Sequence, residues 1–177
     1  HTDVGAFDQV VLAAAADCVE FVSAKCLRIK PIRGQITTVK PAGNLQRVLC
    51  GEGYIAPAHN GVMSTGASFN PKSASTAILD ADRQQNLHNA ALLAAEFARL
   101  EPTGDRAGLR CVTPDYLPAV GPLPQPEFVQ QFAALKVNRN APVDAPAAYY
   151  PQLFCITGLG SRGLTYSPIA AALITAL

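Results

Sequence analysis

Near its end the chain reads Phe154-Cys155-Ile156-Thr157-Gly158-Leu159-Gly160-Ser161-Arg162-Gly163-Leu164, followed by Thr165-Tyr166-Ser167-Pro168 and an apolar segment. Residues 153–156 predict a short buried strand, and the Gly-x-Gly-x-x-Gly spacing predicts a tight turn after it. Ser167 and Pro168 would then be the N-cap and the first-turn proline of a terminal helix. Several backbone N–H groups would converge here, which fits either a plain turn or a cradle for an anion or cofactor. Arg162, a cation inside the turn, favours the cradle.

This turn lies at the wrong end of the chain for the usual dinucleotide-binding fingerprint, which belongs in an opening βαβ unit. Residues 7–16 predict a buried strand instead, without such a turn after it. The chain starts at His1, and no charged segment precedes the apolar residues 13–16, so we expect an excised piece of a longer protein and no secretory leader. No apolar run reaches membrane-spanning length, which argues against a membrane partner.

The composition is typical of a globular domain, with 177 residues, 49% hydrophobic and 15% charged, and a formal net charge of +1. This balance leaves no broad basic field, so nucleic-acid binding by this segment alone is not indicated. The five cysteines include no C-x-x-C pair, which favours reduced thiols, a cytoplasmic location and no metal site over a disulfide or zinc framework.

The middle of the chain predicts a largely antiparallel meander, because short β-branched runs alternate with Gly-bearing turns. We expect strands at residues 31–39, 47–50, 53–58, 61–68 and 108–113. Asp82 and Gln85 form the pattern of a capping box, and apolar residues at helical spacing extend the predicted helix to Leu100. The Pro- and Ala-rich residues 141–151 predict an extended linker.

Few groups could carry chemistry. Arg33, Arg110 and Arg162 each stand beside a glycine or in an apolar strand, where a guanidinium needs an ion-pair partner or a ligand anion. Their ion-pair candidates are Asp115, Glu52 and Asp8. His59 and His88 fit surface positions, and no Ser-His-Asp set, metal-ligand cluster or P-loop can be assembled from the spacings.

Five motifs occur in an order that resembles D-amino-acid-oxidase-like FAD-dependent oxidoreductases. They are Pro31-Ile32-Arg33-Gly34-Gln35, Gly53-Tyr54-Ile55-Ala56-Pro57, Ser64-Thr65-Gly66-Ala67-Ser68, Gly108-Leu109-Arg110 with Thr113-x-Asp115-x-Leu117-Pro118-x-Val120-Gly121, and Gly158-x-Gly160-Ser161-Arg162-Gly163. Within this family the chain is most similar to the C-terminal oxidoreductase half of bifunctional enzymes that modify the wobble uridine of tRNA. The resemblance covers residues 7–177.

The resemblance implies an α+β (α/β) fold, with a mainly antiparallel mixed sheet and flanking helices. Residues 1–22 would be a remnant of the FAD-binding domain, 23–150 the substrate-binding domain, and 151–177 the flavin-contacting strand, turn and helix. The family's N-terminal FAD fingerprint and the methyltransferase half are both missing. The chain would therefore be part of a larger multifunctional enzyme, inactive and without FAD when isolated, and would meet tRNA only through the parent protein.

The implied reaction removes a carboxymethyl group from 5-carboxymethylaminomethyl-2-thiouridine, giving the aminomethyl form and glyoxylate. In related oxidases the arginine of the Gly-Leu-Arg strand binds the substrate carboxylate, which makes Arg110 the expected catalytic and substrate-binding residue. The flavin edge would be held by Gly158, Gly160, Ser161, Arg162, Gly163 and Leu164. Tyr54 and Arg33 lie in motifs that border the substrate in relatives.

Two other functions remain open. A small-molecule amine oxidase acting on glycine or sarcosine shares the same motifs and differs mainly in what covers the site. A non-catalytic interaction domain is the other alternative, and it would have its arginines paired to carboxylates and its Gly-rich turn packed shut.

Overall fold

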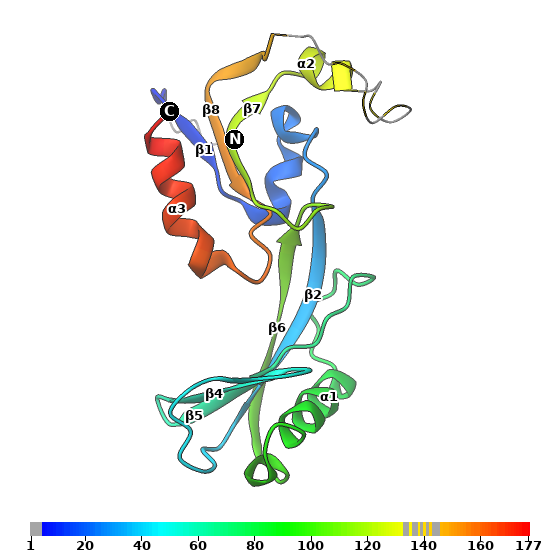
Figure 1. Cartoon of the computed structure of the whole chain (residues 1–177), viewed down its shortest axis with the longest axis vertical. Coiled ribbons are helices and arrows are strands. Elements are labelled where there is room, and N and C mark those ends of the chain that lie inside the picture. Colours follow the sequence, from blue (N-terminus) through cyan, green and yellow to red (C-terminus); the bar gives the residue numbers. More distant parts are fainter. Residues whose placement is uncertain (1–4, 133–134, 136–137, 139, 141, 143–145) are drawn as a thin grey trace. The chain divides into compact units, whose positions relative to one another are not determined.

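The computed structural model describes residues 5–132, 135, 138, 140, 142 and 146–177, and it separates into two compact units. The first comprises residues 1–30 with 110–177, and the second comprises residues 31–109. The elements of both are labelled in Figure 1. These bounds differ from the three segments expected from the sequence, whose functional division stays a prediction.

The second unit is a five-stranded sheet in the order β3-β4-β5-β2-β6. Its strands are β2 (Lys30–Val39), β3 (Leu49–Cys50), β4 (Tyr54–His59), β5 (Val62–Gly66) and β6 (Pro102–Val112). The pairs β3·β4, β4·β5 and β2·β5 are antiparallel, which confirms the predicted pairing of the strands. The predicted meander holds for β3, β4 and β5 only, because β2 lies beside β5 and not beside β3. Asn60 and Gly61 connect β4 to β5 with φ of 49° and 79°, the left-handed values that a tight hairpin turn requires.

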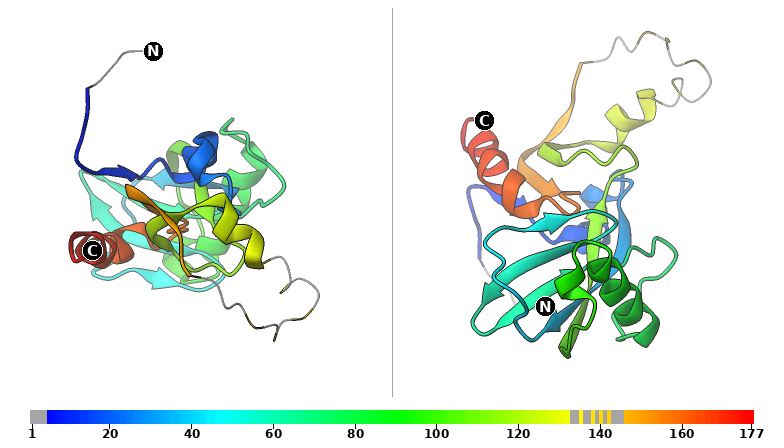
Figure 2. Two further views of the ribbon diagram at one scale, coloured as in Figure 1. Left: turned by 90° about the horizontal axis from the view of Figure 1, so that it is seen from above. Right: turned by 60° about the horizontal axis from the view of Figure 1, so that its bottom comes forward.

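One face of this sheet is covered by α1 (Asp80–Ala91), which packs on β4 and β5 (Figures 1 and 2). The core between them is built from Val39, Ile55, Met63, Ala90 and Phe97, all at most 1% exposed. These apolar contacts supply most of the unit's stability, because burial of apolar area is the main driving force of folding.

The predicted helix over residues 82–100 is wrong in both of its bounds. The helix begins at Asp80 with Leu79 as a cap that makes no side-chain hydrogen bond, and it ends at Ala91. Asp82 pairs with Arg33 and does not cap the helix. Phe97 reaches the core from a separate 3-10 turn, η3 (Ala95–Phe97), so the apolar spacing predicted burial correctly but not continuous helix.

The first unit contains a three-stranded mixed sheet in the order β1-β8-β7. β1 (Val10–Leu12) runs parallel to β8 (Tyr149–Thr157), and β7 (Ala119–Pro124) runs antiparallel to β8. The helix α3 (Gly163–Thr175) packs beside β7 and β8 (Figures 1 and 2). Shorter helices complete the unit: η1 (Ala15–Glu20), η2 (Val22–Ala24) and α2 (Pro126–Gln131).

The core of this unit joins Leu12, Cys18, Ala24, Leu123 and Cys155. Burial raises the pKa of Cys155 to about 11, so its thiol is a neutral core group at physiological pH. The expectation of a buried strand over residues 7–16 needs correction, because β1 is only three residues long and Val10 and Val11 are 41% exposed. β1 is the edge of the described sheet, so only Leu12 is covered.

Two further expectations at the end of the chain need correction. Arg162, not Ser167, is the N-cap of α3, and Pro168 lies inside the helix. The Ser167 hydroxyl donates to the carbonyl of Gly163 at 2.5 Å, so it bonds back within the helix. The predicted linker over residues 141–151 is contradicted at 149–151, which belong to β8, and its residues 141 and 143–145 lie outside the described part of the chain.

No helix among the described residues is long and apolar enough to cross a membrane.

Candidate functional site

The Gly158–Gly163 turn is fastened to the end of β6, close in the chain to Arg110. Leu159 forms an isolated bridge with Val112, and the amide of Gly160 donates to the carbonyl of Cys111 at 2.8 Å. Cys111 follows Arg110 directly, and Arg110 itself is half-buried. The structure thus brings the predicted carboxylate-binding residue and the predicted flavin-contacting turn together within one unit.

The turn holds three amides whose hydrogens find no acceptor among the residues that the structure describes, those of Ser161, Gly163 and Leu164. Those of Gly160 and Arg162 are used, the second by the carbonyl of Leu159 at 3.1 Å. Unsatisfied amides at a helix N-terminus carry partial positive charge. The expected cradle therefore offers fewer open amides than the sequence indicated, since the Gly160 amide is used to hold the turn to Cys111.

Arg162 is exposed beside this cradle, and its guanidinium donates to the hydroxyl of Tyr166 at 3.4 Å. Leu164 is 97% exposed, which leaves the mouth of the helix uncovered by this chain's described residues. Open amides, a helix N-terminus and an exposed guanidinium together suit an electron-rich, partly anionic group such as the edge of a flavin.

A second turn, residues 113–117, packs against the first. Gly158 has φ +72°, and a Cβ there would lie 2.9 Å from the Thr113 methyl carbon. The Leu117 amide and the Thr113 hydroxyl lie 3.1 Å and 2.8 Å from Oδ1 of Asp115. These two donors lower the pKa of Asp115, which stays ionised as the centre of the turn. Asp115 thus has a local structural role and is not the ion-pair partner of Arg33.

Tyr54 and Arg33, the other two predicted substrate residues, belong to the 31–109 unit. Tyr54 opens β4, is half-buried, and lies opposite Gly66 in the register of β5. Its role toward substrate stays a prediction.

Arg33 is fully buried and is held by groups of its own unit. Its Nη1 pairs with Asp82, and its Nη2 donates to Oε1 of Gln35 at 2.9 Å and to the carbonyl of Ala77 at 2.5 Å. Asp115, Glu52 and Asp8 are thus the wrong partners, and Asp82 is the right one. These contacts support a structural role and leave only Nε without a partner among the described residues. Substrate contact by Arg33 stays a prediction without support from this geometry.

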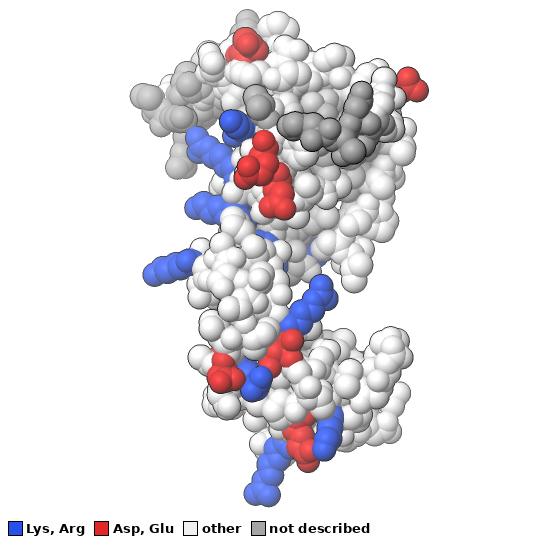
Figure 3. Space-filling view, turned by 180° about the vertical axis from the view of Figure 1, so that it is seen from behind, with Lys and Arg blue, Asp and Glu red and all other residues white. Residues whose placement is uncertain are grey.

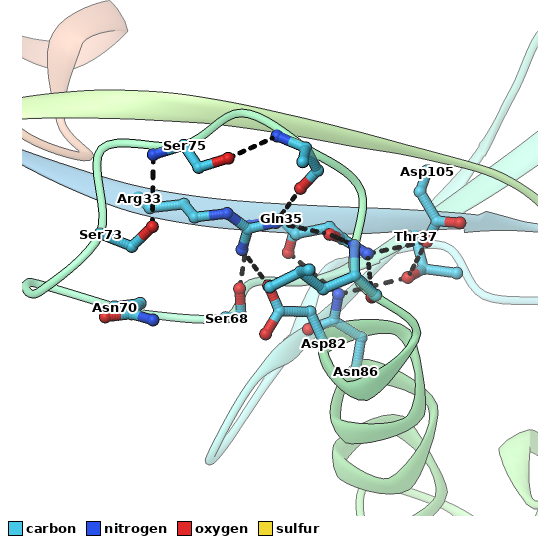
Figure 4. A network of polar contacts seen from close by, with 12 residues as sticks. Arg33, Gln35, Thr37, Ser68, Asn70, Ser73, Ser75, Asp82, Asn86 and Asp105 are labelled. Atoms are coloured by element: carbon cyan, nitrogen blue, oxygen red, sulfur yellow. Dashed lines mark hydrogen bonds and ion pairs between the residues drawn. The ribbon is translucent and has the colours of Figure 1, made fainter.

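The Arg33 pair belongs to a buried polar network that the sequence reasoning missed (Figure 4). Thr37 donates to Oδ1 of Asp105 at 2.8 Å, and Asn86 of α1 donates to the carbonyl of Gln35 at 2.9 Å. Arg83 binds Oδ2 of Asp105 through Nε and Nη2 at 2.7 and 2.5 Å. A signal existed in the sequence: Arg33, Gln35 and Thr37 alternate along one strand and therefore face the same side.

Asp105 makes the stability of this unit depend on pH. Burial alone would raise the pKa of Asp105, but hydrogen bonds from Arg83 and Thr37 outweigh burial and lower it. A carboxylate with a lowered folded-state pKa stabilises the fold above its unfolded value of about 3.9 and loses that contribution as pH falls through the folded value. As the pH is lowered through about 4, we expect the urea concentration at the unfolding midpoint to decrease, and to decrease less steeply in the Asp105→Asn protein. Parallel slopes in both proteins, measured by circular dichroism from acid to neutral pH, would show that Asp105 carries no such linkage.

No group of His, Cys, Asp and Glu side chains in the described ranges could hold a metal ion. All five cysteines are free thiols.

Comparison with known proteins gives one family. Residues 1–177 match the family described as DAO, FAD dependent oxidoreductase. The tRNA 5-methylaminomethyl-2-thiouridine biosynthesis bifunctional protein MnmC of Pseudomonas syringae pv. tomato (strain ATCC BAA-871 / DC3000) is 41% identical, over 94% of this chain and 27% of that protein. The protein of the same name from Stutzerimonas stutzeri (strain A1501) is 36% identical with the same coverage. The chain thus spans about a quarter of the length of these curated relatives.

Solved structures confirm the α+β fold expected from the motifs. Glycine oxidase from Bacillus cereus ATCC 14579 superposes with a TM-score of 0.73 at 19% identity, covering 96% of this chain and 42% of that one. Glycine oxidase from Geobacillus kaustophilus gives 0.70 at 22% identity, covering 95% and 40%. At such identities the likeness shows the fold alone.

Proposed function

Because this chain belongs to the DAO family of FAD-dependent oxidoreductases, we propose that it is the substrate-side part of an enzyme that oxidises a modified wobble uridine of tRNA. The observation that carries the proposal is the 41% identity to an MnmC protein over 94% of the chain. The substrate would be the 5-carboxymethylaminomethyl-2-thiouridine of tRNA. The products would be glyoxylate and the aminomethyl form.

Arg110 would bind the carboxylate of the substrate, since a planar guanidinium can donate two parallel hydrogen bonds to it. This contact would fix the N–CH2 group against the Gly158–Gly163 turn, which is bonded to the residue next to Arg110. The lone pair of the neutral substrate amine would form a C=N bond as the methylene group loses a hydride, and water would then hydrolyse this imine to glyoxylate and the aminomethyl uridine. This reaction requires no strong protein base, so we assign no role in it to His59 and His88.

The residues of the turn fit FAD, because three open amides and Arg162 at a helix N-terminus suit a group that gains negative charge. Ser161, Arg162, Gly163 and Leu164 would hold its edge, with Gly158 and Gly160 shaping the turn. When bound, FAD supplies the acceptor for the hydride. Most of its binding would come from the part of the parent protein that carries the FAD fingerprint.

The test is turnover by the intact protein that contains this chain. We expect glyoxylate to be released from tRNA carrying 5-carboxymethylaminomethyl-2-thiouridine and none from unmodified tRNA. Oxidation of free glycine or sarcosine without turnover of the tRNA would establish the small-molecule amine oxidase instead. If a flavin-loaded protein showed neither activity, the non-catalytic interaction domain would be the remaining alternative.

We further predict that most of the affinity for tRNA lies outside this chain. The chain has 14 Lys and Arg against 13 Asp and Glu, and Figure 3 shows the two signs next to each other at several places on that face. Such a surface releases few counterions from phosphates, and counterion release dominates nucleic-acid affinity. A salt series on one tRNA should therefore give the chain a much weaker affinity and a shallower slope than the intact protein. An affinity within about tenfold of that of the intact protein, with a similar dependence on salt concentration, would show that this chain supplies most of the affinity for tRNA.

A further inference from the structure

Residues 70–79, here called the strap, form most of the connection between β5 and α1 and contain no helix or strand. Almost all of the strap is exposed, including Ile78 and Leu79 at 46% and 43%. Within it, serine and asparagine side chains accept from backbone amides two residues further on, as in Lys72 N to Asn70 Oδ1 at 3.0 Å and Ala77 N to Ser75 Oγ at 3.2 Å. The strap thus contributes no side chain to the buried core.

The strap is fastened at both ends by two residues of β2, Arg33 and Gln35, which Figure 4 labels beside it. At its start the backbones of Asn70 and Arg33 exchange two hydrogen bonds of 2.9 and 3.1 Å. At its end the side-chain amide of Gln35 pairs with the backbone of Leu79. Its Oε1 accepts from the Leu79 N–H and its Nε2 donates to the Leu79 carbonyl, both at 2.9 Å. Arg33 adds its bond to the carbonyl of Ala77.

The structure beneath the strap has its own support. Asp82 holds Arg33 from α1, and Asn86 and Asp105 hold β2 through Gln35 and Thr37. The apolar core of the unit contains no strap residue. Segments with few buried apolar contacts open locally at much lower free energy than the core beneath them.

We propose that the strap opens and closes as one unit over a sheet and helix that stay folded, with Arg33 and Gln35 as its fastening. Opening releases one terminal nitrogen of Arg33 from Ala77 and the amide of Gln35 from Leu79. It thereby uncovers a guanidinium still held in place by Asp82. Direct contact of Arg33 with a ligand carboxylate would require this open state, which makes the strap a gate over an otherwise buried cation.

Hydrogen exchange on the unaltered chain tests the opening directly. The amide of Leu79 reports the fastening, and that of Ile55, a fully buried residue of β4 between β3 and β5, reports the core. We expect Leu79 to exchange much faster than Ile55, with a rate that hardly changes at low urea, because local opening exposes little surface. Equal protection and equal urea dependence of the two amides would mean that the strap opens only when the whole unit unfolds.

Trypsin gives a second measurement, because Lys72 is an exposed cleavage site inside the strap. Gln35→Met keeps a side chain of similar length but removes the two bonds to Leu79, together with the bonds of the same amide to Arg33 and Asp105. It should speed cleavage after Lys72 by about tenfold or more. The matched control is Glu101→Gln, which breaks the exposed Lys40 pair far from the strap and should leave cleavage unchanged. Retained protection at Ile55 shows that the Gln35→Met protein is folded, and unchanged cleavage in that folded protein would overturn the role of Gln35. If the variant does not fold, the exchange experiment decides alone.

Discussion

Replacing Asp82 by Asn should lower the unfolding free energy of the 31–109 unit by about 3–5 kcal/mol. The reason is that Arg33 is 0% exposed, so the variant leaves a buried guanidinium without its counter-charge. The cost of an uncompensated buried charge greatly exceeds the net contribution of a typical ion pair. Urea unfolding followed by circular dichroism measures the loss, and the exchange rate of the Ile55 amide assigns it to this unit.

Glu101→Gln is again the matched control, since the Lys40–Glu101 side chains are 65% and 68% exposed and water screens that pair. It should leave the unfolding free energy nearly unchanged. The double variant Asp82→Leu with Arg33→Met should recover part of the loss, because it removes both charges together. A single Asp82→Asn protein as stable as the control would show that Arg33 does not depend on Asp82.

Arg110→Ala in the intact enzyme should reduce kcat/KM on the modified tRNA by a factor of about thirty to a few thousand. This corresponds to the loss of about 2–5 kcal/mol when one partner of a buried charge pair is removed. The FAD content should stay the same, because the turn is held through the backbone carbonyl of Cys111, which the substitution leaves in place. Steady-state kinetics and flavin absorbance separate the two effects.

Arg106→Ala is the matched control, since Arg106 is an exposed arginine of the same strand, β6. Its removal changes the net charge equally and should leave the kinetics unaltered. Arg110→Lys should recover only part of the activity, because an ammonium cannot make the planar pair of bonds. Unaltered kinetics in Arg110→Ala would remove this residue from the site.

The strands were largely predictable from the sequence because their signals are local. β-Branched alternation placed β2, and a Gly-bearing turn between two short strands placed the β4–β5 hairpin. The five ordered motifs predicted the family, which the comparisons confirm. The bounds of the helices were less accessible, since Asp82 in the first turn of α1 pairs with a guanidinium 49 residues earlier in the chain. The propensities of neighbouring residues cannot predict a contact between such distant positions.

The candidate site was likewise predictable in part. The sequence placed Arg110 and the glycine turn in one reaction, and the structure shows their backbones joined through Cys111 and Gly160. It could not show that Gly160 is occupied by this bond, nor that Arg33 is enclosed by the strap. Both facts depend on contacts between segments that are distant in the chain, and such contacts leave no periodicity to read.

The close approach of Gly158 to Thr113 restricts the order in which substitutions can accumulate at these positions. Any larger residue at position 158 meets a methyl carbon at 2.9 Å and must also adopt a left-handed backbone at φ +72°. Thr113→Ser removes that methyl group and keeps the hydroxyl that lies 2.8 Å from Asp115. We therefore expect a lineage that loses the glycine at position 158 to change position 113 first. The residues that one turn tolerates thus depend on the residue present in the other turn.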